Sequence, residues 1–237
     1  MLKSKTIAIV QSNYIPWKGY FDLAQRVDEL VLYDDAQYTR RDWRNRNLIK
    51  TASGVQWLTI PVSVRGKYLQ RINETRVLDP KWTGRHWKTI VHAYRRAPHF
   101  QDYETRLAYL YAEAANITNL SHVNRHFLAG VLTLLGIQTP LRWSSDFELP
   151  AGRTERLVAI CIQAGATQYL SGPAARTYID QAQFEQAGIG LEFMNYTGYP
   201  VYEQLYPPFI HTVSIIDVIF NTGMDARTFI QSSASDR

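Results

Sequence analysis

The start of the chain places strand-like and helix-like segments in an order that few folds allow. Residues 7–10 form a continuous apolar run typical of a buried strand, residues 19–27 carry apolar side chains at helical spacing, and residues 29–33 form a second strand-like run. A strand, a helix and another strand in this order predict a parallel pair joined by a right-handed crossover. We therefore predict an α/β fold with a mainly parallel, Rossmann-like sheet flanked by helices.

The middle of the chain is predicted to be helical, and the last third returns to alternating strands and helices. Apolar residues at helical spacing predict helices over 82–96, 102–115, 120–135, 154–164, 183–187 and 214–221, with Thr154 as an N-cap. Further strands are predicted at 56–62, 72–78, 142–145, 168–170 and 191–194. We expect one α/β domain over 1–230, a helical subdomain at about 81–136 and a flexible tail over 231–237.

The sequence predicts a cytoplasmic protein. The first residues lack the apolar region of a secretory signal, and no run approaches the length needed to span a membrane. The single cysteine, Cys161, cannot form an intrachain disulfide and lies in an apolar run. We expect it to be a buried hydrophobic side chain without a catalytic role.

Charge and aromatic content point to an anionic ligand. The formal net charge is +5, and 13% of the residues are aromatic, with fifteen tyrosines and six tryptophans. Many of these rings stand beside arginine, aspartate or proline, where amphipathic rings more often line a cleft than fill a core. A basic chain of this kind suits a nucleotide, a nucleotide-sugar or RNA.

The loop between the first strand and the first helix is the first candidate site. Unpaired amide groups and the dipole at a helix N-terminus attract anions. Lys18 can neutralise a phosphate there, and Gly19 lets a ligand approach the backbone closely. We predict substrate contacts from Gln11, Asn13, Tyr14, Trp17, Lys18, Gly19 and Tyr20. The alternative is that the aromatic side chains and Pro16 only pack the loop.

The second candidate site begins where the second strand ends, at Asp34 and Asp35. Paired carboxylates can hold Mg²⁺ or act as a base, so both are candidate catalytic residues. The arginine-rich stretch that follows can bind phosphate groups, stack on a ring or bind RNA. Its predicted substrate-binding residues are Tyr38, Arg41, Asp42, Trp43, Arg44, Asn45 and Arg46. The alternative is a solvated loop of ion pairs within the protein.

Two further places complete the predicted site. Ser171 and Gly172 end a later strand, so their amide-rich turn is expected at the same edge of the sheet, although an ordinary turn has the same appearance. His211, in an aromatic loop, is a candidate general base, although a lone histidine is more often structural. No metal site is predicted, because His122 and His126 have helical spacing but no third ligand.

These same segments resemble the WbqC-like family of bacterial proteins. The resemblance is carried by residues 11–22, 34–38, 41–46, 169–172, 214–217 and 220–223 and extends over nearly the whole chain. One departure is the pair Gln11-Ser12, where the family is expected to favour Gln-Pro, and it leaves the loop freer. The family has no settled catalytic residues, so the site residues above come from the physical argument alone.

The resemblance implies a role in surface polysaccharide synthesis. Some family members are encoded in O-antigen gene clusters, where a glycine transferase activity has been suggested. The leading hypothesis is therefore a transferase that places a glycyl or other small acyl group on an amino-sugar. Its donor is either activated with ATP and Mg²⁺, through Lys18 and Asp34 or Asp35, or preactivated as aminoacyl-tRNA bound by residues 40–46.

Two other hypotheses stay open. One is a different enzyme acting on nucleotide-sugars, in which the arginine cluster binds a pyrophosphate. The other is a non-catalytic protein that binds RNA or a partner in glycan assembly. The sequence gives no indication of the oligomeric state.

Overall fold

A parallel five-stranded sheet forms one end of the molecule. The computed structural model describes residues 4–232. The strands are β1 (Thr6–Val10), β2 (Glu29–Leu32), β5 (Leu141–Trp143), β6 (Gln168–Ser171) and β7 (Gly190–Phe193). They lie in the order β5-β2-β1-β6-β7, and every neighbouring pair is parallel. This confirms the predicted α/β class. Strand order reverses between β1 and β6, the point at which sheets of this kind bind ligands.

Alternating side chains of the central strands bury both faces of the sheet. Ala8 and Leu30 belong to a core shared with α1 (Lys18–Gln25) and α4 (Leu120–Leu134). Ile7 and Val31 point the other way, into a core shared with α5 (Thr154–Gln163) and α6 (Gln181–Gln186). Strands buried on both faces read as continuous apolar runs, which explains why β1 and β2 were visible in the sequence.

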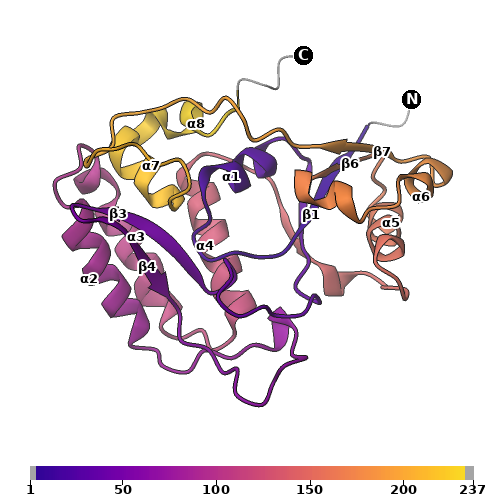
Figure 1. The fold of residues 1–237 in the computed structure, drawn as a ribbon, viewed down its shortest axis with the longest axis horizontal. Helices are drawn as coiled ribbons and strands as arrows, with labels where there is room; N and C mark the ends of the chain where they lie inside the picture. Colours follow the sequence, from indigo (N-terminus) through magenta and orange to yellow (C-terminus); the bar gives the residue numbers. More distant parts are fainter. Residues whose placement is uncertain (1–3, 233–237) are drawn as a thin grey trace.

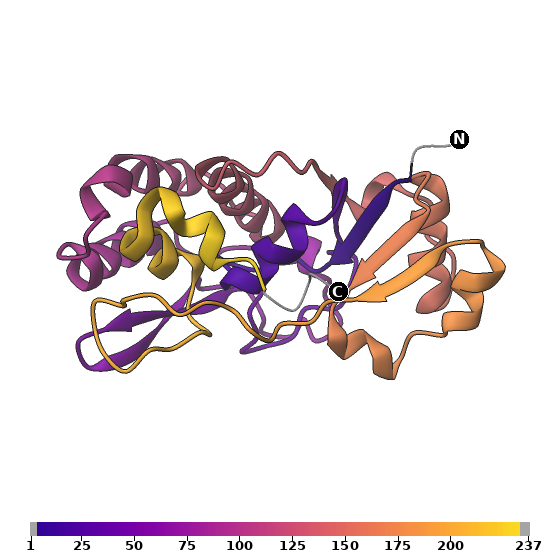
Figure 2. The ribbon, with the colours of Figure 1, turned by 90° about the horizontal axis from the view of Figure 1, so that it is seen from above.

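The other end of the molecule combines a hairpin with helices (Figures 1 and 2). The hairpin is β3 (Arg46–Thr51) paired antiparallel with β4 (Gly54–Thr59). Around it lie α2 (Trp82–Tyr94), α3 (Phe100–Ala114), α7 (Ile215–Thr222) and α8 (Ala226–Phe229). Residues of α2, α3 and α4 share the larger core with one face of the sheet. The division into domains and subdomain stays a prediction.

A long segment without regular structure, residues 194–214, returns from β7 to α7 along α1 (Figure 1). We call it the strap. Tyr196 and Tyr199 pack edge-on against Trp17, and the backbone amide of Ser214 donates to Leu48 of β3. The strap thereby fastens the sheet end to the hairpin end.

Several local predictions need correction. Strand β3 was missed, and 72–78 contains a short 3-10 helix (Ile72–Glu74) and isolated bridges instead of a strand. Thr154 is the first residue of α5 and Arg153 its N-cap, and the Thr154 hydroxyl accepts from the amide of Asp180 instead of capping the helix. Other 3-10 turns are Ser144–Asp146, Pro173–Thr177 and Gly223–Asp225. Residues 233–237 of the predicted tail lie outside the described residues.

No helix among residues 4–232 is both long and apolar enough to cross a membrane. Cys161 is buried, and burial raises the pKa of its thiol to about 12. An inert thiol of this kind agrees with the packing role that the sequence indicated.

Candidate functional site

A cleft of about 1020 Å³ opens at the carboxyl ends of β1 and β6, where strand order reverses. We call it the switch-point cleft. Val10, Gln11 and Asn13 line it from the end of β1, and Ser171 and Gly172 line it from the end of β6. The cleft therefore lies at the edge of the sheet where the sequence placed the candidate site.

The charged residues of this lining are all arginines. Arg44 enters from the segment after β2, and Arg153 and Arg156 enter from the start of α5. Rings make up much of the remaining wall: Trp17, Tyr20, Tyr33, Trp43, Tyr169, Tyr178 and Tyr196. Fixed positive charge among aromatic faces suits a ligand that carries phosphates and a planar ring.

Arg44 is held in place while part of its donor capacity stays unused. Its Nη1 donates to the Oδ1 atom of Asn13, and its Nη2 lies 3.5 Å from a carboxylate oxygen of Asp42. Although burial opposes it, hydrogen bonding from Thr39 and the charge of Arg44 keep the pKa of Asp42 below its usual value. The Nε of Arg44 is buried without a partner among the described residues. A ligand anion in the cleft can satisfy a donor of this kind.

The loop from Gln11 to Trp17 has a rigid shape. Ile15 is fully buried and has a φ of 36°, a conformation that non-glycine residues adopt only when their surroundings enforce it. The side-chain amide of Asn47 donates to the carbonyls of Tyr14 and Ile15, and the Ser214 hydroxyl donates to the latter. The hairpin and the strap thus fix the loop before any ligand binds.

Gly19 has a packing reason for its lack of a side chain. A Cβ atom there would lie 2.3 Å from the indole ring of Trp17. Glycine therefore lets this ring fold back over the start of α1, where it lines the cleft. The predicted contact of Gly19 with a ligand is replaced by an indirect role, since it sets the position of Trp17.

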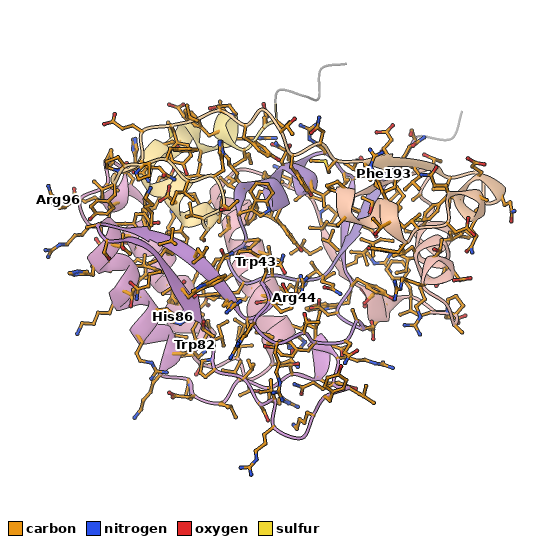
Figure 3. All side chains as sticks on the ribbon, in the orientation of Figure 1. Trp43, Arg44, Trp82, His86, Arg96 and Phe193 are labelled. Atoms are coloured by element: carbon orange, nitrogen blue, oxygen red, sulfur yellow. The ribbon has the colours of Figure 1, made fainter. Side chains whose placement is uncertain are left out.

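A second cavity, of about 240 Å³, adjoins the cleft. We call it the side chamber. Its lining shares Asn13, Trp17 and Trp43 with the switch-point cleft and adds Pro16, Asn47 and Thr212. In Figure 3, Trp43 and Arg44 lie in the middle of the molecule, between the hairpin and the sheet. Two adjoining cavities at this position can hold two reactants side by side.

The first predicted catalytic carboxylate, Asp34, is turned away from open space. It is 1% exposed and accepts from the amide and hydroxyl of Ser12 at 2.8 and 2.7 Å, and from the hydroxyl of Ser121 on α4. Burial raises the pKa of Asp34, although the hydrogen bonds from Ser121 and Ser12 oppose the shift. Its contacts give it a positioning role, because it ties the cleft loop to α4.

The second, Asp35, is also engaged within the protein. Its carboxylate accepts from Ser144 at 2.5 Å and from the Asn73 side chain at 3.1 Å, and it lies 3.6 Å from Arg71. Among residues 4–232, no group of three or more histidine, cysteine or acidic residues is placed to hold a metal ion. The predicted binding of Mg²⁺ by Asp34 or Asp35 thus gains no support from their surroundings.

Lys18 points into the protein, toward the strap. Its side chain is buried, and its Nζ donates to the carbonyl of Pro200 at 3.0 Å. Burial lowers the pKa of Lys18 to about 8, although the charge of Asp217 opposes the shift. The predicted phosphate contact of Lys18 is therefore replaced by an internal one.

Asp217 is the centre of a buried cluster that the sequence did not reveal. It accepts from Tyr94, Tyr202 and Gln204 at 2.9, 2.7 and 2.9 Å. The Nζ of Lys50 donates to the side chain of Gln204 at 3.1 Å. The charge of Asp217 supports the protonated forms of Lys18 and Lys50. We call Lys18, Lys50 and Asp217 the buried cluster, and it joins α1, β3, α7 and the strap.

The remaining predicted residues have other surroundings. Tyr14 is fully buried, and its hydroxyl bonds to His86 at 2.9 Å and to Tyr111 at 2.6 Å. Both partners belong to the helical end of the molecule, where Figure 3 labels His86 and Trp82. His211 packs against Phe209, and burial followed by the charge of Lys18 lowers its pKa.

Five residues of the arginine-rich segment also lie outside the lining of the cleft, and one of them is Asp42, the partner of Arg44 described above. Tyr38 and Asn45 are buried, and the side chain of Asn45 donates to the carbonyl of Ile60. Arg46 stacks over Trp57 and also donates to the carbonyl of Arg41, which is exposed with a φ of 58°. The cleft thus takes Gln11, Asn13, Trp17, Tyr20, Trp43, Arg44, Ser171 and Gly172 from the predicted set.

Sequence reasoning missed Arg153, Arg156 and Tyr196, which also line the cleft. The two arginines flank the first residues of α5, three positions apart and just after Gly152. Positive residues at the start of a helix oppose its dipole, so this pairing was a usable sign of a ligand. Tyr196 had no such sign, since only the path of the strap brings it to the cleft.

Comparison with known proteins agrees with the resemblance seen in the sequence. A profile of the WbqC-like protein family matches residues 11–229. The chain is 48% identical over 227 residues to "Uncharacterized protein Rv1507c" of Mycobacterium tuberculosis (strain ATCC 25618 / H37Rv), a match that covers 96% of this chain and 98% of that protein. No solved structure gives a significant match. The chain therefore belongs to the WbqC-like protein family.

Proposed function

We propose that this protein is a transferase that attaches a glycyl or other small acyl group to the amino group of a nucleotide-linked amino-sugar, for use in surface polysaccharide synthesis. The observation that carries the proposal is the switch-point cleft, whose charged lining consists of three arginines among aromatic walls. In open parallel sheets this position is the usual place for nucleotides.

Different lining residues of the cleft suit different parts of such a substrate. The guanidinium forks of Arg153 and Arg156 and the close backbone approach allowed by the turn at Ser171 and Gly172 suit a diphosphate. Arg44 donates to Asn13, which with Trp17 also lines the side chamber. A sugar held at Arg44 and Asn13 would present its amino group to whatever occupies the side chamber.

Amide formation at this place needs donors for the carbonyl oxygen of the acyl group. Because the Oδ1 atom of Asn13 accepts from Arg44, its Nδ2 amide remains available to donate, and the Arg44 Nε has no partner among the described residues. Donors fixed in advance stabilise the negative charge that develops as an amine attacks a carbonyl. Since Lys18, Asp34 and Asp35 have internal partners, the geometry favours a preactivated acyl donor over activation with ATP and Mg²⁺.

The first test is a thermal-shift screen of the purified protein with ATP, UDP, nucleotide-sugars and free amino acids. We expect a nucleotide or nucleotide-sugar to raise the midpoint of unfolding, and Arg44→Ala to abolish the shift while the free protein stays folded by circular dichroism. Arg96→Ala, at the far end of α2 in Figure 3, is the matched control. A shift that Arg44→Ala leaves intact would place the ligand elsewhere.

The second test separates transfer from other chemistry on the same ligand. The protein is incubated with a nucleotide-linked amino-sugar and glycyl-tRNA, or with glycine and ATP, and the sugar is followed by mass spectrometry. A gain of one glycyl residue supports the proposal and identifies the donor. Conversion of the nucleotide-sugar without acylation, or binding without conversion, favours a different nucleotide-sugar enzyme or a binding protein.

A further inference from the structure

An exposed aromatic and basic surface begins at the mouth of the switch-point cleft. Trp43 lines the cleft yet is 40% exposed, and its ring lies 5.4 Å from that of Trp57 on β4, which is 42% exposed. The Arg46 guanidinium lies 4.0 Å from the centre of the Trp57 ring. Trp57 is absent from the lining of both cavities.

A basic loop continues this surface. Arg46 donates to the carbonyl of Arg41, and the side chain of the adjacent Arg40 donates to the carbonyl of Val64, where the loop 64–71 begins. The loop carries Arg65, Lys67, Tyr68, Leu69 and Arg71, all exposed, with Tyr68 at 80% and Leu69 at 77%. We call Arg40, Arg41, Trp43, Arg46, Trp57 and residues 64–71 the Trp57 surface.

The cations of this surface are mostly unneutralised. Of the described residues, no carboxylate lies within ion-pair distance of Arg40, Arg41, Arg65 or Lys67. The ion pairs recorded near this surface are Asp42 with Arg44 and Asp35 with Arg71, and neither involves these four cations. Free cations beside exposed rings are the arrangement with which proteins hold single-stranded nucleic acid, through phosphate contacts and base stacking.

From these contacts we propose that the Trp57 surface binds the single-stranded 3′ end of an RNA and that the acyl donor of the proposed transfer is an aminoacyl ester on that end. The second half of this statement rests on the proposed function, whereas RNA binding does not. Bases stack on Trp57 and Trp43, and the loop 64–71 contacts phosphates further along the strand. Trp43 is shared with the side chamber, so the ester at the end of the strand reaches that chamber.

The transfer is balanced without another reactant. The amino nitrogen of the sugar attacks the ester carbonyl, a C–N bond forms and the C–O bond to the ribose breaks. The proton lost by the amine is taken up by the departing ribose oxygen, which leaves as a free hydroxyl group. Ester aminolysis of this kind needs no metal and no ATP at the site.

The experiment measures binding of a short unstructured RNA that ends in CCA by fluorescence anisotropy, together with binding of UDP by calorimetry. Trp57→Ala is expected to weaken RNA binding about tenfold, the effect of losing one stacked base, and to leave UDP binding unchanged. Arg65→Ala/Lys67→Ala is expected to weaken RNA binding and to lower the salt dependence by about 0.7 in log–log slope for each phosphate that the variant no longer neutralises.

Matched controls are Tyr109→Ala, an exposed tyrosine on α3, and Arg96→Ala/Arg106→Ala, two exposed arginines of the helical end that lie outside the Trp57 surface. Neither should change RNA binding. RNA binding that is absent, or equally weakened by controls and test variants, overturns the proposal. The proposal is also overturned if Trp57→Ala leaves RNA binding intact and instead abolishes a dimer seen by light scattering. If the wild-type protein binds the RNA but does not bind UDP, the proposed function is contradicted and RNA binding by the Trp57 surface is not.

Discussion

Two groups of cations lie near the same loop, and they are built in opposite ways. Arg44, Arg153 and Arg156 line the switch-point cleft, and among the described residues only Arg44 has a carboxylate within ion-pair distance, that of Asp42 at 3.5 Å. Lys18 and Lys50 are 1% exposed and share the field of Asp217, which is fully buried. The first group is open to a ligand, and the second is satisfied within the protein.

The difference shows that the partners, and not the type of charge, decide what a cation does. An arginine that reaches an open cleft keeps donors for phosphate or carboxylate groups. A buried lysine needs a nearby carboxylate and carbonyl oxygens to offset the cost of leaving water, and its charge is then engaged within the protein. Lys18 of the buried cluster bonds to the strap, and the strap carries Tyr196 to the cleft. The buried cluster therefore helps to shape the cleft that the three arginines line.

The largest expected effect comes from removing the carboxylate of the buried cluster. Asp217→Asn removes the negative charge that supports the protonated forms of Lys18 and Lys50, and it makes the hydrogen bonds from Tyr94 and Tyr202 neutral ones. Each hydrogen bond to a charged group contributes about 1.5–3 kcal/mol, so losing the charge of two of them costs about 3–5 kcal/mol. The free energy of unfolding in urea should fall by that amount. Asp102→Asn, at an exposed residue of α3, serves as control and should change it by less than about 0.5 kcal/mol. If Asp217→Asn lowers the free energy of unfolding by no more than the control does, the members of the buried cluster do not depend on one another for stability.

The next effect is a pH dependence carried by Lys18. Its folded pKa is lowered to about 8 by burial, against 10.5 when exposed. Below pH 8 both states are protonated and the cost of the buried charge is present in full. Between pH 8 and 10.5 the unfolded state binds more protons, so the free energy of unfolding rises with pH, by between about 1 and 3 kcal/mol.

Lys18→Met tests this dependence, because methionine keeps a long apolar side chain without a charge. The wild-type free energy of unfolding should rise relative to that of Lys18→Met between pH 7.5 and 10, measured in urea at matched ionic strength. Lys88→Met, at an exposed position of α2, should run parallel to the wild type. Parallel curves for Lys18→Met as well would show that the lysine is solvated.

The sequence predicted the frame of the molecule better than the partners of its polar residues. The strands β1 and β2 and helices α2, α3 and α4 were visible because their apolar residues follow one period. The edge of the sheet that forms the cleft followed from the strand order. Strand β3 was missed, since its buried positions include Asn47 and Lys50, which no hydrophobic pattern reports.

Side-chain partners from distant segments could not be read from the sequence. The sequence near Asp34 shows no partner for its carboxylate. In the structure Asp34 accepts a hydrogen bond from Ser121, which lies eighty-seven positions away. Lys18 looked poised for a phosphate, yet it donates to Pro200, one hundred and eighty-two positions on. Trp43 and Arg44 line the cleft, whereas Asp42, Asn45 and Arg46 of the same segment bond within the protein, so the local sequence located the segment but not the direction of each side chain.

The smallest effect on stability is expected where the cations are open. Arg153→Ala/Arg156→Ala should change the free energy of unfolding by no more than about 0.5 kcal/mol, because surface residues away from buried networks contribute little. UDP binding should nevertheless weaken about tenfold or more, since each charge-assisted contact to a phosphate contributes about 1.5–3 kcal/mol. Calorimetry with UDP and urea unfolding, with Arg96→Ala/Arg106→Ala as control, measure both. If Arg153→Ala/Arg156→Ala instead loses stability and keeps its affinity for UDP, these two arginines are structural cations like those of the buried cluster.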